Sequence, residues 1–225
     1  MYLSHVSLIL NIDTAVESAS ICLADNDRPL VLRTNPVQKD HASWIHNAIR
    51  DLWIEAGITA GALDAIAVSA GPGSYTGLRV GMATAKGLAF ALNIPLIAVG
   101  TLKMMAFAAK GKSDALLCPM IDARRMEVFT AVFDADLNEV LKSTNLVLDE
   151  NSFGSLLETH HIIFFGNGSN KFRPLMHHPH AFFQEISASA LHMAFLSYSK
   201  FLKREFSDLA YSEPFYGKEF HSSVK

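Results

Sequence analysis

The segment with the clearest chemical potential is GPGSYTGLRVG, at residues 71–81. It follows an apolar run of strand character and opens a helix-like stretch. Glycine at Gly71, Gly73 and Gly77 permits positive φ angles and close backbone approach, and the free N–H groups of a following helix attract an anion. The spacing matches neither the dinucleotide fingerprint nor the P-loop. Two interpretations stay open, an anion-binding loop and a tight strand-to-helix turn.

Asp13 ends the first apolar run of the chain, and a carboxylate there could hold a metal-bound water near the phosphates of a nucleotide. Thr14 and Ala15 follow it instead of a glycine-containing phosphate turn, which argues against intrinsic ATP hydrolysis. The candidate site is a vestigial nucleotide or anion loop. Its residues are Asp13, Gly71, Gly73, Ser74 and Gly77.

Arg79 is expected in the first turn of a helix predicted over residues 78–92, where its charge opposes the helix dipole. A carboxylate or phosphate supplied across a subunit interface would compensate that charge. The alternative is a purely structural loop beside an unfavourably placed cation.

The histidines form no obvious metal site. His41 and His46 are five residues apart, about 140° round a helix, so they do not share a face. His177, His178 and His180 lie among prolines, and we expect them to be solvated.

Other residues of chemical interest fall into no catalytic motif. The sequence contains no H-E-x-x-H, G-x-S-x-G or Ser/His/Asp constellation. Asp122 and Glu127 begin a predicted strand region, and we expect surface ion pairs between them and Arg124 or Arg125.

The first half of the chain must position these residues with a mixed sheet and helices. Three hairpin strands come first, followed by a helix that ends at Gly57 and then by alternating strands and helices. The predicted strands are 6–12, 19–24, 29–34, 65–70 and 95–99, and the predicted helices are 41–56, 78–92 and 101–110.

The second half repeats this order after a candidate linker at residues 111–114. We therefore predict a domain over 1–110 and a smaller one over 111–225, whose tail could return to the first. The predicted strands are 115–121, 126–133, 139–148 and 161–165, and the predicted helices are 152–158 and 188–204.

Two helices of the first half carry more apolar surface than one core needs. The helix over 78–92 is apolar almost all round, and Trp44 and Ile54 lie off the apolar stripe of the helix over 41–56. An interface with another protein chain is predicted there. The candidate interface residues are His41, Trp44, Ile45, Ala48, Arg79, Met82, Ala83, Ala85 and Lys86.

Composition narrows the function further. Nineteen Lys and Arg against 22 Asp and Glu give a net charge of −3, which argues against a free-standing nucleic-acid binder. Cys22 and Cys118 lie in apolar runs and are predicted to be reduced core residues. Neither a signal peptide nor a membrane helix is predicted, and we expect a cytoplasmic protein.

The chain resembles the TsaB family of tRNA threonylcarbamoyladenosine biosynthesis subunits. The resemblance rests on LILNIDTA at 8–15, the long glycine motif at 71–81, AKGLA at 85–89 and IDAR at 121–124, with EPFY at 213–216 near the end. It implies an α/β fold of duplicated ribonuclease-H-like sheets with helices, of the actin and sugar-kinase type. It also implies dimerisation through the two helices described above.

The resemblance further implies a non-catalytic role beside a TsaD-type subunit, which transfers a threonylcarbamoyl group to the adenosine next to the anticodon. Those tRNAs read codons that begin with A. A TsaE-type ATPase is the second implied partner, the chain alone is expected to form a homodimer, and tRNA is expected to be met only indirectly. No cofactor is expected, apart from a nucleotide that a subunit interface could hold.

Catalytic TsaD relatives carry an H-x-x-x-H metal pair at the start of the helix after the strand that here is 95–99. The matching positions are Thr101 and Met105, which are not ligands for such an ion. Two other function classes stay open, an actin-fold ATPase or small-molecule kinase and a metal-dependent peptidase. Nucleotide titration and elemental analysis would distinguish them.

Overall fold

A computed structural model describes residues 6–37, 40–111 and 114–217. They form two compact units, which we call unit 1 (residues 6–104 and 188–214) and unit 2 (residues 105–187 and 215–217). The sequence predicts the helix near residues 188–204 in the second domain, but it packs on the sheet of unit 1. The division between the units falls inside α3 (Thr101–Ala109) rather than at the predicted linker. Residues 112 and 113 of that linker lie outside the described residues.

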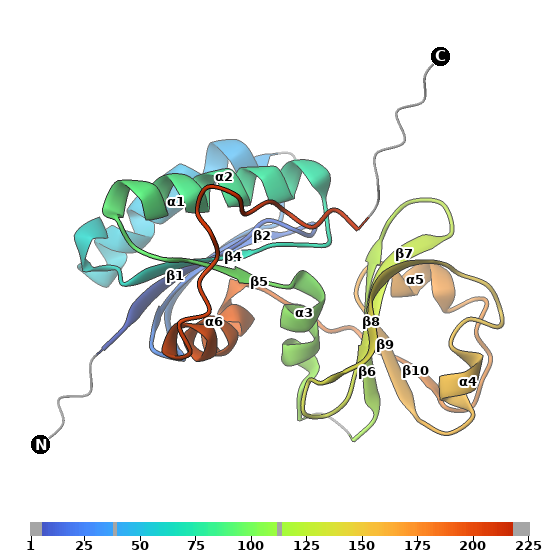
Figure 1. Cartoon of the computed structure of the whole chain (residues 1–225). Coiled ribbons are helices and arrows are strands. Elements are labelled where there is room, and N and C mark those ends of the chain that lie inside the picture. Colours follow the sequence, from blue (N-terminus) through green and yellow to red (C-terminus); the bar gives the residue numbers. More distant parts are fainter. Residues whose placement is uncertain (1–5, 38–39, 112–113, 218–225) are drawn as a thin grey trace, which may run out of the picture. The chain divides into compact units, whose positions relative to one another are not determined.

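Unit 1 contains a five-stranded mixed sheet in the order β3-β2-β1-β4-β5 (Figure 1). β1 pairs antiparallel with β2 and parallel with β4. All five strands appear within two residues of their predicted ends. They are β1 Leu8–Asp13, β2 Ala19–Asp25, β3 Arg28–Asn35, β4 Ala65–Ser69 and β5 Leu96–Val99.

Helices cover both faces of this sheet. α1 (His41–Ala56) and α2 (Tyr75–Leu92) lie on one face, and α6 (Met193–Leu202) lies on the other with the short η3 (Ala190–His192) before it (Figure 1). A further short turn of helix, η2 (Ala60–Ala62), precedes β4. The core of unit 1 therefore has two layers, one on each side of the sheet.

α1 has the predicted bounds because its apolar residues recur at helical spacing. Ile45, Ile49 and Leu52 are buried against the sheet. The helix ends where Gly57 takes a φ of 65°, a left-handed cap that suits glycine.

Unit 2 contains a second five-stranded sheet, which in the order β8-β7-β6-β9-β10 matches the strand order of unit 1. β6 pairs antiparallel with β7 and parallel with β9, as β1 does with β2 and β4. The predicted duplicated α/β fold is thus confirmed. The strands are β6 Leu116–Asp122, β7 Glu127–Phe133, β8 Glu139–Val147, β9 Ile162–Phe165 and β10 Ala181–Phe183.

The helices of unit 2 that follow β8 and β9 are much shorter than those of unit 1. α4 (Gly154–Leu157) and α5 (Ser169–Phe172) have four residues each. The sequence analysis missed α5 and β10, because elements of three or four residues show no measurable period.

Both cysteines are free and buried, one in each unit. Burial raises the pKa of Cys22 and of Cys118 to about 12, so both stay protonated at neutral pH. Within the described ranges, no helix has the combined length and apolar character needed to cross a bilayer.

Candidate functional site

The glycine loop, residues 71–77, joins β4 to α2. Gly71 has a φ of 109°, a conformation that glycine tolerates. Its N–H donates to the Oγ1 of Thr101 at 3.2 Å, and its carbonyl accepts from the N–H of Thr101 at 2.9 Å. The N–H of Ser74 donates to the carbonyl of Ala15 at 2.7 Å. The loop is therefore attached to the start of α3 and to the turn after β1.

Three glycines of this region are needed for close approach. A Cβ at Gly73 would lie 2.3 Å from the carbonyl oxygen of Ala15, and one at Gly77 would lie 2.0 Å from that of Thr14. A Cβ at Gly81 would lie 2.3 Å from the Oγ1 of Thr14, which itself donates to the carbonyl of Gly77 at 2.7 Å. Of the two properties that glycine permits here, Gly73 and Gly77 use the close backbone approach, since both have ordinary φ angles. This packing favours the tight-turn interpretation, because residues 14 and 15 of the same chain lie against the loop.

α2 begins at Tyr75, three residues before the predicted start. The Oγ of Ser74 accepts from the N–H of Gly77 at 3.3 Å and caps the helix. Arg79 is therefore the fifth helical residue, and its prediction in the first turn is wrong. Its guanidinium donates to the hydroxyl of Tyr75 at 3.2 Å and lies 5.4 Å from the centre of that ring. Arg79 thus has a local partner within α2.

Asp13 is completely buried at the end of β1. Its Oδ1 accepts from the Oγ of Ser69 at 2.6 Å and from the N–H of Ala15 at 3.0 Å. Burial raises the pKa of Asp13, although these hydrogen bonds and the charge of His41 act in the opposite direction. The Oδ2 of Asp13 and both ring nitrogens of His41 are buried without a hydrogen-bond partner among the described residues. Burial thus favours the protonated carboxyl, which is a poor metal ligand.

Five of the predicted interface residues belong to the interior of unit 1. They lie on the inward faces of α1 and α2, so their side chains present almost no surface to a partner. The prediction that they form an interface is corrected on this ground. These residues are His41, Ile45, Ala48, Met82 and Ala85.

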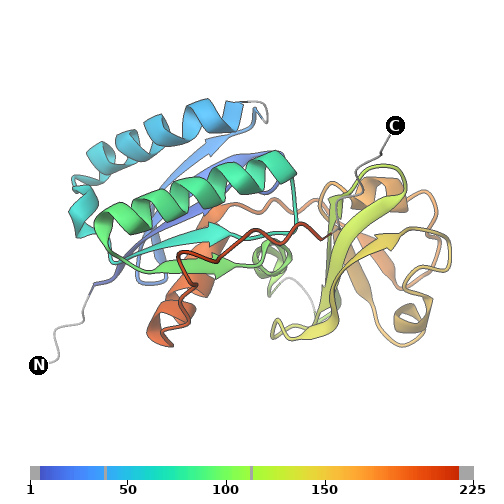
Figure 2. The same ribbon diagram turned by 45° about the horizontal axis from the view of Figure 1, so that its top comes forward.

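The outer faces of α1 and α2 carry large exposed side chains, and the two helices lie side by side (Figure 2). Phe90 is 78% exposed and Ile54 is 72% exposed. Sequence reasoning missed Phe90 and Tyr75, although helical spacing relates them to Arg79 and Ala83. We call the following set the α1–α2 surface: Trp44, which is half-buried, with Ile54, Tyr75, Arg79, Ala83 and Phe90.

Lys86 was also predicted in the interface, but its ammonium group is used within unit 1. It donates to the carbonyl oxygens of Ala210 and Ser212, both at 3.1 Å. The N–H of Ser207 donates to the carbonyl of Leu96 at 2.8 Å. The segment after α6, red in Figure 2, is therefore fastened to α2 and to the edge of β5.

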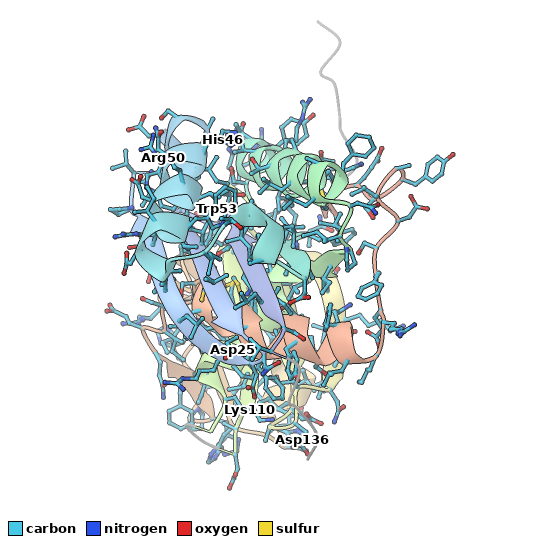
Figure 3. The ribbon with its side chains drawn as sticks, turned by 90° about the vertical axis from the view of Figure 1, so that its left-hand side faces the viewer. Asp25, His46, Arg50, Trp53, Lys110 and Asp136 are labelled. Carbon is cyan, nitrogen blue, oxygen red and sulfur yellow. The ribbon has the colours of Figure 1, made fainter. Side chains whose placement is uncertain are left out.

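The positions matched to the metal pair of TsaD relatives are buried. Thr101 is hydrogen-bonded to Gly71, and Met105 is 5% exposed. His46 lies on the exposed side of α1 with Arg50, both labelled in Figure 3, whereas His41 is buried. No group of three or more His, Cys, Asp or Glu residues in the described part of the chain has an arrangement that could hold a metal ion.

Two of the histidines near β10 are less solvated than predicted. His180 is half-buried, and its Nδ1 lies 2.8 Å from the carbonyl oxygen of Leu157. Its ring centre lies 5.2 Å from that of His178 and 4.6 Å from that of His161. Of the three loop histidines, His177 is exposed as predicted, whereas His178 and His180 are half-buried.

The turn between β6 and β7 also differs from the prediction. Asp122 forms its ion pair with Lys171 at 2.7 Å, rather than with Arg124 or Arg125. Lys171 comes from α5, which the sequence analysis missed. The partner of Asp122 was therefore not visible in the sequence.

Known proteins resemble this chain in sequence and in structure. The family model described as TsaD, tRNA N6-adenosine threonylcarbamoyltransferase, matches residues 35–217. The TsaB protein of Bacillus subtilis (strain 168) is 35% identical over 144 residues, which are 62% of this chain and 62% of that protein. The TsaB protein of Escherichia coli (strain K12) is 36% identical over 133 residues, 59% of this chain and 57% of that protein. The chain thus spans about three fifths of the length of these curated relatives.

Solved structures agree with the sequence relatives. A Pseudomonas aeruginosa protein described as uncharacterized, with similarity to peptidase YEAZ, has a TM-score of 0.81 and 26% identity, covering 94% of this chain and 100% of its own. The activator of 2-hydroxyisocaproyl-CoA dehydratase from Clostridium difficile has a TM-score of 0.51 and 6% identity, covering 89% of this chain and 98% of its own, and shows the fold alone. The chain therefore belongs to the family described as tRNA N6-adenosine threonylcarbamoyltransferase (TsaD), and its predicted resemblance to TsaB proteins is confirmed.

Proposed function

We propose that this chain is a non-catalytic subunit required to form the threonylcarbamoyl group on the adenosine next to the anticodon. The tRNAs concerned read codons that begin with A. The chain acts by dimerising with a TsaD-type catalytic subunit and supporting it. Because the molecule that the proposed complex modifies is tRNA, we place the chain in the cytoplasm.

The observation that carries this proposal is the α1–α2 surface. Phe90 and Ile54 are large apolar side chains, each more than 70% exposed, on two adjacent helices of one face. Isolated exposed apolar residues are common, but a group on neighbouring helices is typical of a protein-binding surface. Arg79 adds a charge whose only partner within α2 is the Tyr75 ring and hydroxyl.

The non-catalytic role is supported by what fills the positions of the family's metal pair. Thr101 uses both its hydroxyl and its N–H to hold Gly71, and Met105 is a core residue. Asp13 is sealed and biased towards its neutral form by burial. These residues therefore have structural roles, which leaves chemistry to the partner.

The α1–α2 surface is also the proposed binding site for the partners of the chain. We propose a homodimer through the α1–α2 surface when the chain is alone, and a heterodimer with the TsaD-type subunit when both are present. A TsaE-type ATPase would join that heterodimer, and the place for a nucleotide would be a subunit interface.

The test uses Phe90→Glu and Ile54→Glu. Each should yield a folded monomer by light scattering and bind the TsaD-type protein of the same cell about tenfold or more weakly, because burial of one such side chain contributes about 1.5 to 3 kcal/mol. Leu202→Glu is the matched control, since Leu202 is 64% exposed on α6, on the opposite face of the sheet. In cells depleted of the wild-type chain, mass spectrometry of tRNA nucleosides should show that only the control restores threonylcarbamoyladenosine.

If both variants still form dimers, the interface does not lie on these helices. Tight nucleotide binding with turnover by the isolated chain, or metal-dependent proteolysis, would instead support the ATPase, kinase or peptidase interpretations. A wild-type gene that fails to restore the modified nucleoside would contradict the proposed function itself.

A further inference from the structure

The turn between β6 and β7 contains two consecutive arginines in the left-handed conformation. Arg124 has a φ of 70° and Arg125 a φ of 49°. This conformation is unfavourable for residues with a Cβ, and it is ordinarily occupied by Gly, Asn or Asp. Such backbone strain persists where the surrounding structure enforces it, and it is concentrated at functional sites.

Lys171 enforces the conformation of this turn. Its ammonium group donates to the Oδ1 of Asp122, the carbonyl of Arg125 and the carbonyl of Glu127, each at 2.7 Å. The same Oδ1 accepts from the N–H of Arg124 at 2.6 Å. The N–H of Asp122 in turn donates to the side chain of Asn167 at 2.9 Å. The backbone of the turn is thus held from two sides.

The guanidinium groups that this turn presents are not used inside the protein. Arg124 and Arg125 are both exposed, and no hydrogen bond or ion pair joins either guanidinium to another described residue. Two carboxylates near this turn have other partners. Asp122 holds Lys171, and Asp149 accepts from the N–H of Asn151 at 3.0 Å.

We propose that this turn binds the phosphodiester backbone of tRNA, one phosphate to each arginine. Guanidinium groups bind phosphate oxygens in bidentate fashion, and phosphate contacts position a protein on nucleic acid without reading its sequence. The inference rests on the proposed function, and it departs from the expectation that tRNA is met only indirectly. A net charge of −3 limits such binding to a local contact that assists a larger complex.

The key variant is Arg124→Asn with Arg125→Asn. Asparagine accepts the left-handed conformation, so the double variant should fold with an unchanged or higher melting temperature. The control is Arg28→Ala with Arg204→Ala, which removes the same charge from two exposed positions in unit 1. Both are compared with wild type in a reaction reconstituted with the TsaD-type and TsaE-type proteins of the same cell, with the unmodified tRNA transcript as substrate.

The Asn variant should raise the KM for tRNA about fivefold or more with kcat unchanged, because it loses binding that substrate and transition state share. The slope of log KM against log salt should fall by about 1 to 2, as expected for two lost phosphate contacts. The control should resemble wild type.

Equal KM values for the Asn variant and the control would overturn the inference while leaving the proposed function intact. Loss of affinity for the TsaD-type protein, with tRNA affinity retained, would also overturn it and make the turn a docking site for an acidic protein surface. Absence of modification with the wild-type chain would contradict the proposed function, and this inference with it.

Discussion

Units 1 and 2 carry an equivalent aspartate at the end of the central strand, with opposite exposure. In each, the central strand ends in an aspartate whose Oδ1 accepts the N–H of the residue two positions later, Ala15 in unit 1 and Arg124 in unit 2. Asp13 is fully buried, and burial raises its pKa. Asp122 is exposed, and although partial burial acts to raise its pKa, the hydrogen bond and charge of Lys171 lower it overall.

The helix that contacts each turn accounts for this difference. α2 has 18 residues and meets the first turn through glycines that allow backbone contact. α5 has four residues and meets the second turn through the side chain of Lys171. The same strand order therefore supports a sealed turn in one unit and an open, charged turn in the other.

The largest predicted effect is on the glycine contact of unit 1. Gly77→Ala should lower the free energy of unfolding by about 3 kcal/mol, a fall of about 6 to 12 °C in melting temperature, because its Cβ would meet the Thr14 carbonyl oxygen at 2.0 Å. Gly87→Ala is the matched control in α2, where nothing lies within 4 Å, and it should stabilise by about 0.5 to 1 kcal/mol. Equal melting temperatures for the two variants would show that the close approach is not a constraint.

The second prediction concerns pH and Asp13. Because burial raises the folded-state pKa above the unfolded value, the stability that this group contributes is present below about pH 4 and is lost as pH rises through the folded pKa. Asp13→Asn should therefore be more stable than wild type at pH 8, with the advantage shrinking towards pH 4. Denaturant unfolding across this range measures it. An advantage that grows at acid pH would mean that Asp13 is charged in the folded protein.

The third prediction uses the open turn of unit 2. Lys171→Met should cost about 1 to 2 kcal/mol at pH 7, since three hydrogen bonds from one ammonium are lost, and it should speed hydrogen exchange at the amides of Arg124 and Glu127. The lowered pKa of Asp122 means that its contribution is present above about pH 4 and is lost as pH falls through the folded value, so the cost should shrink in acid. Lys142→Met, at an exposed position of β8, should change neither quantity.

The smallest predicted effect on stability is at Arg79. Its contact with Tyr75 is exposed, so Arg79→Ala should change the free energy of unfolding by no more than about 0.5 kcal/mol. Calorimetric titration should nevertheless show weaker binding to the TsaD-type protein. Unchanged affinity would restrict Arg79 to its contact within α2, and a large loss of stability would show that this contact matters to the fold.

Much of the fold was predictable because it depends on patterns within short windows. The alternation and apolar runs of β1 to β5 predict the strands of unit 1, and the helical spacing of Ile45, Ile49 and Leu52 predicts α1 with its observed bounds. The glycine motif and the IDAR segment carry the family resemblance, which the comparisons confirm. These features need only the order of residues along the chain.

Only the tertiary structure decided the contacts between residues that are far apart in the chain. Lys86 donates a hydrogen bond to a carbonyl oxygen 124 positions later, and Lys171 donates one to an aspartate 49 positions earlier. Both are ordinary surface lysines in the sequence, because a hydrogen bond leaves no periodic signal when its partners are distant. The same reason explains Gly73 and Gly77, whose missing side chains serve the backbone at residues 14 and 15 rather than their own φ angles. Local sequence determined which elements form, and packing between distant segments decided which turn is sealed and which faces solvent.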